Sequence, residues 1–158
     1  MRISTKGRYA LEALLDLALQ DRDGFVALRG VGLRRDLSEN YLEQLFSDLR
    51  RCGIVTSLRG QQGGYRLARD PASITAGDVL RAVEGPLVPV ACIAALSQAG
   101  CGPVEESEPC PRQDACVTRL LWIRMMEAIA TAADGVTLAD LIADCRASRL
   151  EAASEYEI

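Results

Sequence analysis

The chain of 158 residues contains no histidine. This absence excludes Ser-His-Asp and Cys-His catalysis, zinc enzymes with histidine ligands and haem held by histidine, because each of these sites needs an imidazole. The sequence also shows no pair of carboxylates and no phosphate-cradling loop that could be tied to a reaction. We therefore expect that the protein is not an enzyme.

Long apolar runs are absent as well. No run approaches the roughly 20 residues that span a bilayer, and charges between Arg2 and Asp16 interrupt the apolar residues where a secretory signal would need an unbroken core. We expect no membrane partner and a cytoplasmic location, where cysteines usually serve metal or redox chemistry. A mass of 17.1 kDa fits one small domain with an appendage.

Basic charge is scarce overall but unevenly placed. The net charge of −4 argues at first against a polyanionic partner. Residues 1–70, however, hold 12 basic and 9 acidic residues, whereas residues 71–158 hold 6 and 13. Seventeen of the 18 basic residues are arginine, which binds phosphate through a planar fork, although genomic base composition produces the same bias. A nucleic-acid partner for the first half is therefore compatible with the charge.

Apolar periodicity and capping signals predict three helices, a hairpin and a fourth helix in the first half. The expected helices cover residues 4–20, 28–35, 38–52 and 75–84, and the expected strands cover 54–58 and 65–68. Gly30 and Gly32 weaken the second helix, since each costs about 1 kcal/mol against alanine. The order is typical of a winged helix-turn-helix domain, which we assign to residues 1–86.

The third expected helix presents a polar face suited to reading bases. Asn and Gln side chains can bond adenine edges in bidentate fashion, and Glu can accept from cytosine N4. An ordinary solvated helix face is the alternative interpretation, and the neighbouring glycine-tipped hairpin counts against it. The side chains of this face are Asn40, Glu43, Gln44, Ser47 and Arg51.

Four of the six cysteines lie in a proline-bearing acidic segment, residues 87–116, which we expect to be a loop. Cys92, Cys101, Cys110 and Cys116 are separated by 8, 8 and 5 residues. Sulfur donors on a loop suit an iron–sulfur cluster or a zinc site, and scattered reduced thiols are the alternative. Cys52 and Cys145 are expected to be packing residues at helix ends.

The last part of the chain is expected to hold a dimerisation helix and a C-terminal helix, residues 117–146, followed by a tail, residues 147–158. Trp122, Met125, Ile129 and Ala132 follow one another at steps of 3, 4 and 3 residues. Such a seam fits a helix–helix contact between two subunits or ordinary core packing. The expected fold is thus mainly α with a small β-hairpin.

Several motifs closely resemble the IscR/NsrR/CymR superfamily of bacterial transcription regulators, and the resemblance covers about the whole chain. These motifs are Ser4-Thr5-Lys6-Gly7-Arg8-Tyr9-Ala10, Leu37-Ser38-Glu39-Asn40-Tyr41-Leu42-Glu43-Gln44-Leu45, Arg59-Gly60-Gln61-Gln62-Gly63-Gly64-Tyr65, Ile74-Thr75-Ala76-Gly77-Asp78-Val79, Leu120-Leu121-Trp122 and Leu138-Ala139-Asp140-Leu141.

The resemblance implies a homodimer that binds a double-stranded DNA operator. It places Asn40, Glu43, Gln44 and Arg59 where relatives read the operator, with Arg59 in the minor groove. Ser47, Arg51, Gly60 and Gln61 belong to the same expected DNA-binding set. Phosphate contacts are expected from Arg2, Ser4, Lys6, Tyr9 and Tyr41.

The resemblance extends to the cysteines. Cys92, Cys110 and Cys116 match the cluster-binding loop of the iron–sulfur members, which favours a [2Fe-2S] over a [4Fe-4S] cluster. The interval between Cys92 and Cys110 is longer than in those members, and Arg119 stands where some relatives place a histidine ligand. Cys101 is the fourth ligand we favour, and Glu12 of the partner subunit is the substitute.

Three hypotheses follow. The first is a transcriptional regulator whose operator binding is controlled by an iron–sulfur cluster. The second is a cluster-free regulator of the same fold, controlled by thiol oxidation, zinc or a partner protein. The third, a small electron-transfer or metal-carrier protein, leaves the base-reading helix and the hairpin unexplained.

Overall fold

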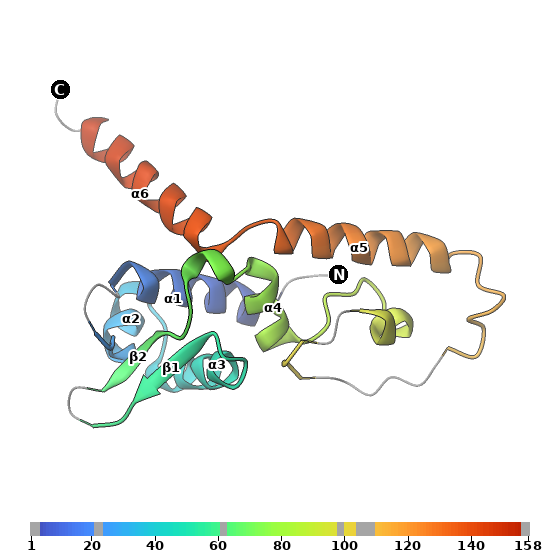
Figure 1. Ribbon diagram of the computed structural model, residues 1–158, viewed down its shortest axis with the longest axis horizontal. Helices are drawn as coiled ribbons and strands as arrows, with labels where there is room; N and C mark the ends of the chain where they lie inside the picture. Colours follow the sequence, from blue (N-terminus) through green and yellow to red (C-terminus); the bar gives the residue numbers. More distant parts are fainter. Residues whose placement is uncertain (1–3, 21–23, 61–62, 98–99, 104–109, 156–158) are drawn as a thin grey trace.

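The computed structural model describes residues 4–20, 24–60, 63–97, 100–103 and 110–155, and it is mainly helical with one two-stranded hairpin, as expected (Figure 1). The α-helices are α1 (Thr5–Gln20), α2 (Leu28–Arg35), α3 (Glu39–Arg51), α4 (Ala76–Glu84), α5 (Arg119–Asp134) and α6 (Leu138–Glu155). The strands are β1 (Val55–Leu58) and β2 (Gly64–Leu67), and two 3-10 helices are η1 (Pro71–Ser73) and η2 (Ala91–Leu96).

Helices α1 to α4 and the hairpin enclose the core. The apolar stripe of α1 and the apolar side of α3 face each other, and Leu14, Leu17, Leu45 and Phe46 are fully buried there. The start of α6 contributes Leu138 and Ile142 to the core, and the rest of α6 and most of α5 extend away from this body, while η2 lies on the side opposite the hairpin (Figure 1). The expected winged helix-turn-helix arrangement is therefore present.

Local capping explains where the helices begin and end. The Ser38 hydroxyl accepts from the Tyr41 backbone N–H at 3.3 Å and caps α3. Gly53 follows the end of α3 with a φ of 65°, a left-handed conformation that glycine adopts without strain. Thr75 and Asp78 form the expected capping box at the start of α4.

Helix α2 forms over its expected residues despite its two glycines. A side chain at Gly32 would bring its Cβ within 2.6 Å of the Leu37 backbone carbonyl, so the turn between α2 and α3 can be this close only with glycine there. Asp36 completes the turn in the left-handed region, with a φ of 53°. Gly32 thus enables the turn, a role that helix propensity alone does not indicate.

The hairpin is fixed to the body by one extra pairing. Strands β1 and β2 are antiparallel, with Val55 opposite Leu67 and Leu58 opposite Gly64. Val26 and Tyr65 exchange two backbone hydrogen bonds of 2.8 and 2.9 Å, so the segment before α2 is extended beside β2. The hairpin therefore keeps a fixed position beside α3.

The second half differs from expectation in two places. Helix α6 continues to Glu155, whereas we expected a tail from residue 147, because no glycine or proline interrupts residues 138–155. The expected loop contains η2, whose Ile93 is buried. Because α6 continues to Glu155, Cys145 lies within this helix rather than at its end. None of the helices in the described part has the length and apolarity to cross a membrane.

A buried carboxylate joins α1 to α2. Asp16 is 3% exposed, and its Oδ2 lies 2.7 Å from Arg34 Nη2, while its Oδ1 lies 3.5 Å from Arg35 Nε. A buried charge is tolerated only when it is paired, and here two guanidiniums share one carboxylate.

We predict that Asp16→Asn lowers the free energy of unfolding by about 2 kcal/mol, because the amide leaves buried polar groups unpaired. Urea denaturation measures the change. Glu12→Gln is the matched control, since Glu12 pairs with Arg8 on the exposed face of α1 at 3.7 Å, and it is expected to change stability by under about 0.5 kcal/mol. Equal effects of the two substitutions would contradict the prediction.

Candidate nucleic-acid interface and cysteine loop

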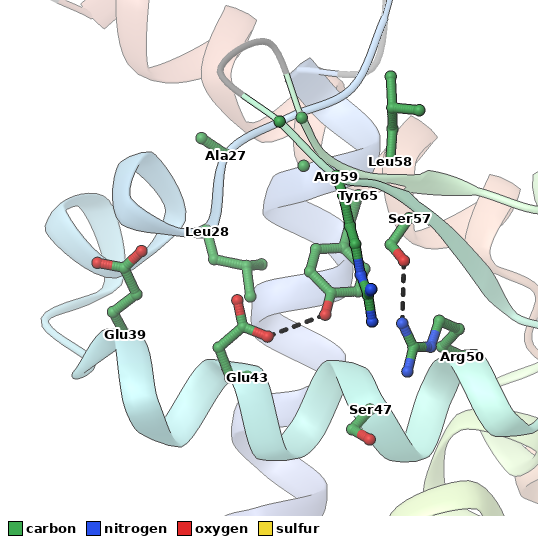
Figure 2. A pocket seen from close by; sticks show the side chains of 13 residues that line it. Ala27, Leu28, Glu39, Glu43, Ser47, Arg50, Ser57, Leu58, Arg59 and Tyr65 are labelled. Carbon is green, nitrogen blue, oxygen red and sulfur yellow. Dashed lines mark hydrogen bonds between the residues drawn. The ribbon is translucent and has the colours of Figure 1, made fainter.

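A groove of about 450 Å³ runs between α3 and the hairpin (Figure 2). Helix α3 forms one wall with Glu39, Glu43, Ser47 and Arg50, and the hairpin forms the other. The remaining lining residues are Ala27, Leu28, Ser57, Leu58, Arg59, Gly60, Gly63, Gly64 and Tyr65.

The polar face of α3 is exposed, as expected. Asn40, Glu43, Gln44 and Ser47 are all exposed to solvent, while the other side of the same helix is fully buried. Burial of the apolar side fixes which way the polar side chains point. The buried side chains are Leu42, Leu45, Phe46 and Leu49.

Tyr65 holds Glu43 in the groove. The Tyr65 hydroxyl donates to Glu43 Oε2 at 2.9 Å, and its ring is 8% exposed and lies edge-on to Phe46 (Figure 2). Burial raises the pKa of Tyr65, and the hydrogen bond to the Glu43 carboxylate and its charge raise it further. The phenol therefore stays protonated as a donor. The sequence alone did not indicate this role, because it arises from the packing of β2 against α3, which are distant in the chain.

Two arginines line the groove from opposite walls. Arg50 of α3 donates from Nη1 to Ser57 Oγ at 3.1 Å, and Arg59 comes from the hairpin tip (Figure 2). Arg59 and Gly60 are exposed, and Gly60 has a φ of 115° that suits a turn. Gln61 lies outside the described residues. Arg50 was not among the expected DNA-binding residues, because its position on α3 gives no sign that it differs from an ordinary solvent-exposed arginine.

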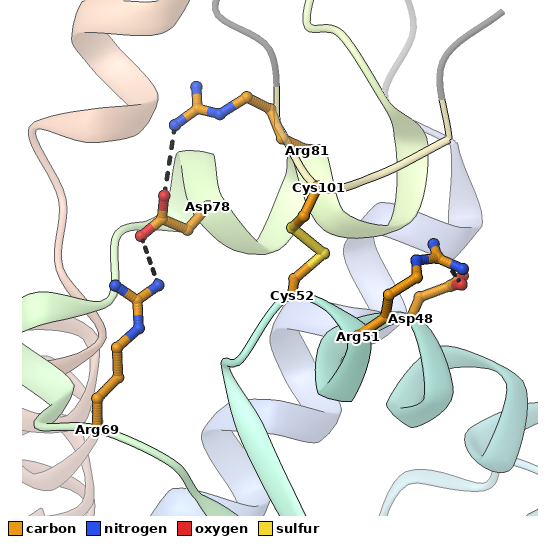
Figure 3. The surroundings of a disulfide bond; sticks show 7 residues. All are labelled: Asp48, Arg51, Cys52, Arg69, Asp78, Arg81 and Cys101. Atoms are coloured by element: carbon orange, nitrogen blue, oxygen red, sulfur yellow. Dashed lines mark hydrogen bonds and ion pairs between the residues drawn. A yellow bond between two sulfur atoms is a disulfide. The ribbon is translucent and has the colours of Figure 1, made fainter.

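The other expected DNA-binding residues lie near the N-terminal end of α1 and at the two ends of α3. Lys6 Nζ lies 2.8 Å from Asp48 Oδ2. Arg51 Nη2 lies 2.9 Å from Asp48 Oδ1 (Figure 3). One carboxylate thus orients two cations. Tyr9 and Tyr41 meet edge to face, with ring centroids 6.1 Å apart.

Ser4 is engaged by α4. Its backbone N–H and hydroxyl donate to Glu84 Oε1 at 3.1 and 2.6 Å, and the Gly7 N–H donates to the same oxygen at 2.8 Å. Glu84 therefore caps α1 from a distant element. Arg2 lies outside the described residues.

The cysteines do not assemble as we expected. Cys101 forms a disulfide with Cys52, with Cα atoms 5.3 Å apart (Figure 3). Cys92 is exposed, and Cys110 and Cys116 are half-buried. In the part of the chain that the structure describes, no three Cys, Asp or Glu residues are grouped to hold a metal ion.

The disulfide corrects two expectations. Cys52 does pack against the core at the end of α3, but it is not a free thiol. Cys101 cannot serve as a fourth ligand in this arrangement, because a sulfur bonded to another sulfur offers no thiolate. As placed, the described cysteines do not fit an iron–sulfur cluster.

Cys116 stands out among the free cysteines. The pKa of its thiol is lowered, first by a hydrogen bond with the Thr118 hydroxyl, 3.5 Å away, then by the backbone N–H groups of Thr118 and Arg119 and the Arg119 charge. These groups lie at the start of α5. The thiolate of Cys116, the form that binds metals and attacks disulfides, therefore forms more readily than that of an ordinary cysteine.

Helix α5 has a wide exposed apolar face. Met126 is its one buried residue among those described, and Trp122 and Ile129 of the expected seam are half-buried. The exposed large apolar side chains on and next to this helix are Val117 (95%), Leu120 (58%), Leu121 (52%) and Met125 (40%).

Comparison with known proteins identifies the family. The model of the Rrf2 family, described as an iron-dependent transcriptional regulator, matches residues 3–144. The chain is 42% identical over 141 residues to the HTH-type transcriptional regulator CymR of Bacillus subtilis, covering 89% of each chain. It is 39% identical over 142 residues to the HTH-type transcriptional regulator IscR of Yersinia enterocolitica, covering 90% of this chain and 79% of that protein.

The fold gives the same answer. The solved structure of T. potens IscR superposes on this chain with a TM-score of 0.67 at 37% sequence identity. The superposition covers 92% of this chain and 88% of that chain. The family match, residues 3–144, covers α1 to α4 and the hairpin and continues past the cysteine loop into α6. The chain therefore belongs to the Rrf2 family of transcriptional regulators.

Proposed function

We propose that this protein is a homodimeric regulator that reads its operator with α3 in the major groove and with the hairpin tip in the minor groove. The observation that carries the proposal is the groove between α3 and the hairpin. There, exposed hydrogen-bonding side chains are set on a helix whose other face is locked in the core. Family membership supports DNA binding.

Each wall of the groove has its own part in this proposal. Asn40 and Gln44 would bond adenine edges, and Glu43, held by Tyr65, would accept from cytosine N4. Arg59 would enter the minor groove, where a planar guanidinium fits the narrow A·T-rich form. Phosphate contacts would come from Arg2, Ser4, Lys6, Tyr9 and Tyr41, and Ser47, Arg51, Gly60 and Gln61 complete the proposed DNA-binding set.

We predict that Arg59→Ala weakens operator binding about tenfold, chiefly at A·T-rich minor-groove positions. Glu43→Ala should relax base preference at one position by about 1–3 kcal/mol, and Tyr65→Phe should relax the same position by less. Fluorescence anisotropy with operator duplexes selected by the wild-type protein from random sequence measures both effects.

Arg149→Ala, an equal change of charge on exposed α6, serves as the control and should leave affinity and preference unchanged. The proposed docking is wrong if Arg59→Ala and Glu43→Ala both behave like this control.

The proposed second subunit would cover the exposed face of α5. Leu121, Met125, Ala128 and Ala132 follow at steps of 4, 3 and 4 residues and are all exposed. This spacing is that of a helix–helix seam, and its alanines allow close approach. The same face on a second copy is self-complementary, as a two-fold dimer requires.

We predict that Leu121→Glu converts the dimer into monomers, because dimerisation would bury an unpaired carboxylate. Sedimentation equilibrium measures the mass, and operator affinity should fall with it. Gln20→Glu adds the same charge on the exposed end of α1 and should leave the dimer intact. A wild-type protein that is monomeric at micromolar concentration would refute the dimer.

For the control of DNA binding, we propose an iron–sulfur cluster held by Cys92, Cys110 and Cys116, with Cys101 as the fourth ligand once its disulfide is reduced. The sulfur-only ligand set and the lowered pKa of Cys116 support it, as does the iron-dependent description of the family. A [2Fe-2S] cluster is favoured. The loop would have to rearrange, because the described cysteines lie apart.

Cluster-free control is the second candidate, with thiol oxidation ahead of zinc or a partner protein. The Cys52–Cys101 disulfide favours it. The similarity to CymR, the global cysteine regulator of B. subtilis, also supports it.

We predict that anaerobically purified wild-type protein absorbs visible light and contains iron and acid-labile sulfide, and that Cys110→Ala loses both because one ligand is removed. Cys145→Ser should keep them, since Cys145 lies in α6 away from the loop. Colourless wild-type protein would reject the cluster, and one zinc per chain would favour the zinc form.

A further inference from the structure

The Cys52–Cys101 disulfide joins two parts of the molecule with different tasks. Cys52 is the residue at the C-terminal end of α3, the proposed base-reading helix, and Cys101 belongs to the cysteine loop, 49 residues further along the chain. The bond therefore connects the reading head directly to the proposed sensor (Figure 3).

The same stretch of loop is seated on α4. A Cβ on Gly102 would collide with the Arg81 backbone carbonyl, and one on Gly100 would come within 3.1 Å of the Arg81 side chain. Glycine at both positions allows the loop to lie directly on α4. The disulfide thus holds the loop at a place where Gly100 and Gly102 already allow it to pack on α4.

Arg81, on which the loop packs, also contacts α5. The Arg81 side chain is 11% exposed, and its guanidinium pairs with Asp134 in the last turn of α5 and with Asp78 of α4. Thr75, the cap of α4, also donates to Asp134, at 3.3 Å. The end of α3, the loop, α4 and the end of α5 are therefore linked in series by the disulfide, by the packing of the loop on α4, and by the polar contacts of Asp134.

The disulfide is also reachable by small molecules. A cavity of about 250 Å³ beside it is lined by Cys52, Ile54, Arg69, Asp78, Arg81, Gly100 and Cys101. Cys101 is exposed and Cys52 half-buried, so an incoming thiolate has easier access to the Cys101 sulfur. In a compartment that holds DNA, where small thiols keep cysteines reduced, a disulfide of this kind is usually transient and redox-sensing.

We propose that Cys52 and Cys101 form a reversible thiol–disulfide pair whose state sets how the reading head is coupled to α5. The inference rests on the proposed function for its DNA readout. It adds a redox site, with a low-molecular-weight disulfide as its oxidant and the matching thiol as its reductant. It also makes the disulfide and the fourth cluster ligand alternative uses of Cys101.

The exchange balances in both directions. A small-molecule thiolate attacks the Cys101 sulfur, the S–S electron pair leaves with the Cys52 sulfur, and a second thiolate then displaces Cys101 from the mixed disulfide. Two small-molecule thiols thus become one small-molecule disulfide, and the protein gains two thiols. Oxidation is the reverse, with the small-molecule disulfide taking up the two electrons.

The test uses full-length metal-free protein, equilibrated with either oxidised or reduced glutathione. Differential alkylation and peptide mass spectrometry report the state of the pair. Hydrogen exchange at residues 100–102 and 131–134 reports the coupling, and anisotropy with the selected operator reports DNA binding. The variants are Cys52→Ser and Cys101→Ser, so that one remains if the other does not fold, and Cys145→Ser is the control.

We expect the wild-type protein and Cys145→Ser to close the disulfide with oxidised glutathione and to open it with reduced glutathione. Reduction should speed exchange in both segments and change operator affinity about fivefold or more. Cys52→Ser and Cys101→Ser should show neither response to glutathione.

Failure to map a Cys52–Cys101 linkage after oxidation would overturn the proposal. So would a disulfide that opens and closes while exchange at residues 131–134 stays constant, because the bond would then be only a local staple. If no operator can be selected, the proposed function fails, and the mapping and exchange still decide whether the pair is coupled to α5.

Discussion

The proposed DNA-binding surface depends on the burial of Tyr65. Its ring lies 5.1 Å from that of Phe46, centroid to centroid, its backbone pairs with Val26, and its hydroxyl reaches Glu43. One residue thus joins the hairpin, the extended segment before α2 and α3. Without its ring and hydroxyl, the Arg50–Ser57 hydrogen bond and the turn after α3 would still connect the two walls of the groove, but Glu43 would lose its partner on the hairpin.

Much of the DNA-binding body could be predicted from sequence, because its signals are local. The Ser38 cap, the Thr75–Asp78 capping box and the glycine after α3 each involve residues that lie within four positions of the helix end that they fix. The polar face of α3 follows from helical periodicity alone. For these elements, the expected and observed bounds differ by at most one residue at each end.

The parts that sequence reasoning missed depend on contacts between distant residues. The spacing of the four loop cysteines suggested that they belong together, but Cys101 lies beside Cys52, which no local pattern links to it. The roles of Gly32, which lies against the Leu37 carbonyl, and of Tyr65, which holds Glu43, have the same origin. The end of α6 was predicted too early, although no glycine or proline lies between residues 147 and 155 to end the helix.

Asp48 has a consequence for how the protein responds to salt. It already neutralises part of the charge of Lys6 and Arg51 before any DNA is present. When phosphates approach, these two cations exchange one anion for another, so they displace fewer ions from solution than two free cations would, and the pair is held in place beforehand. The affinity of this surface for DNA should therefore fall less steeply with ionic strength than a count of its basic residues suggests.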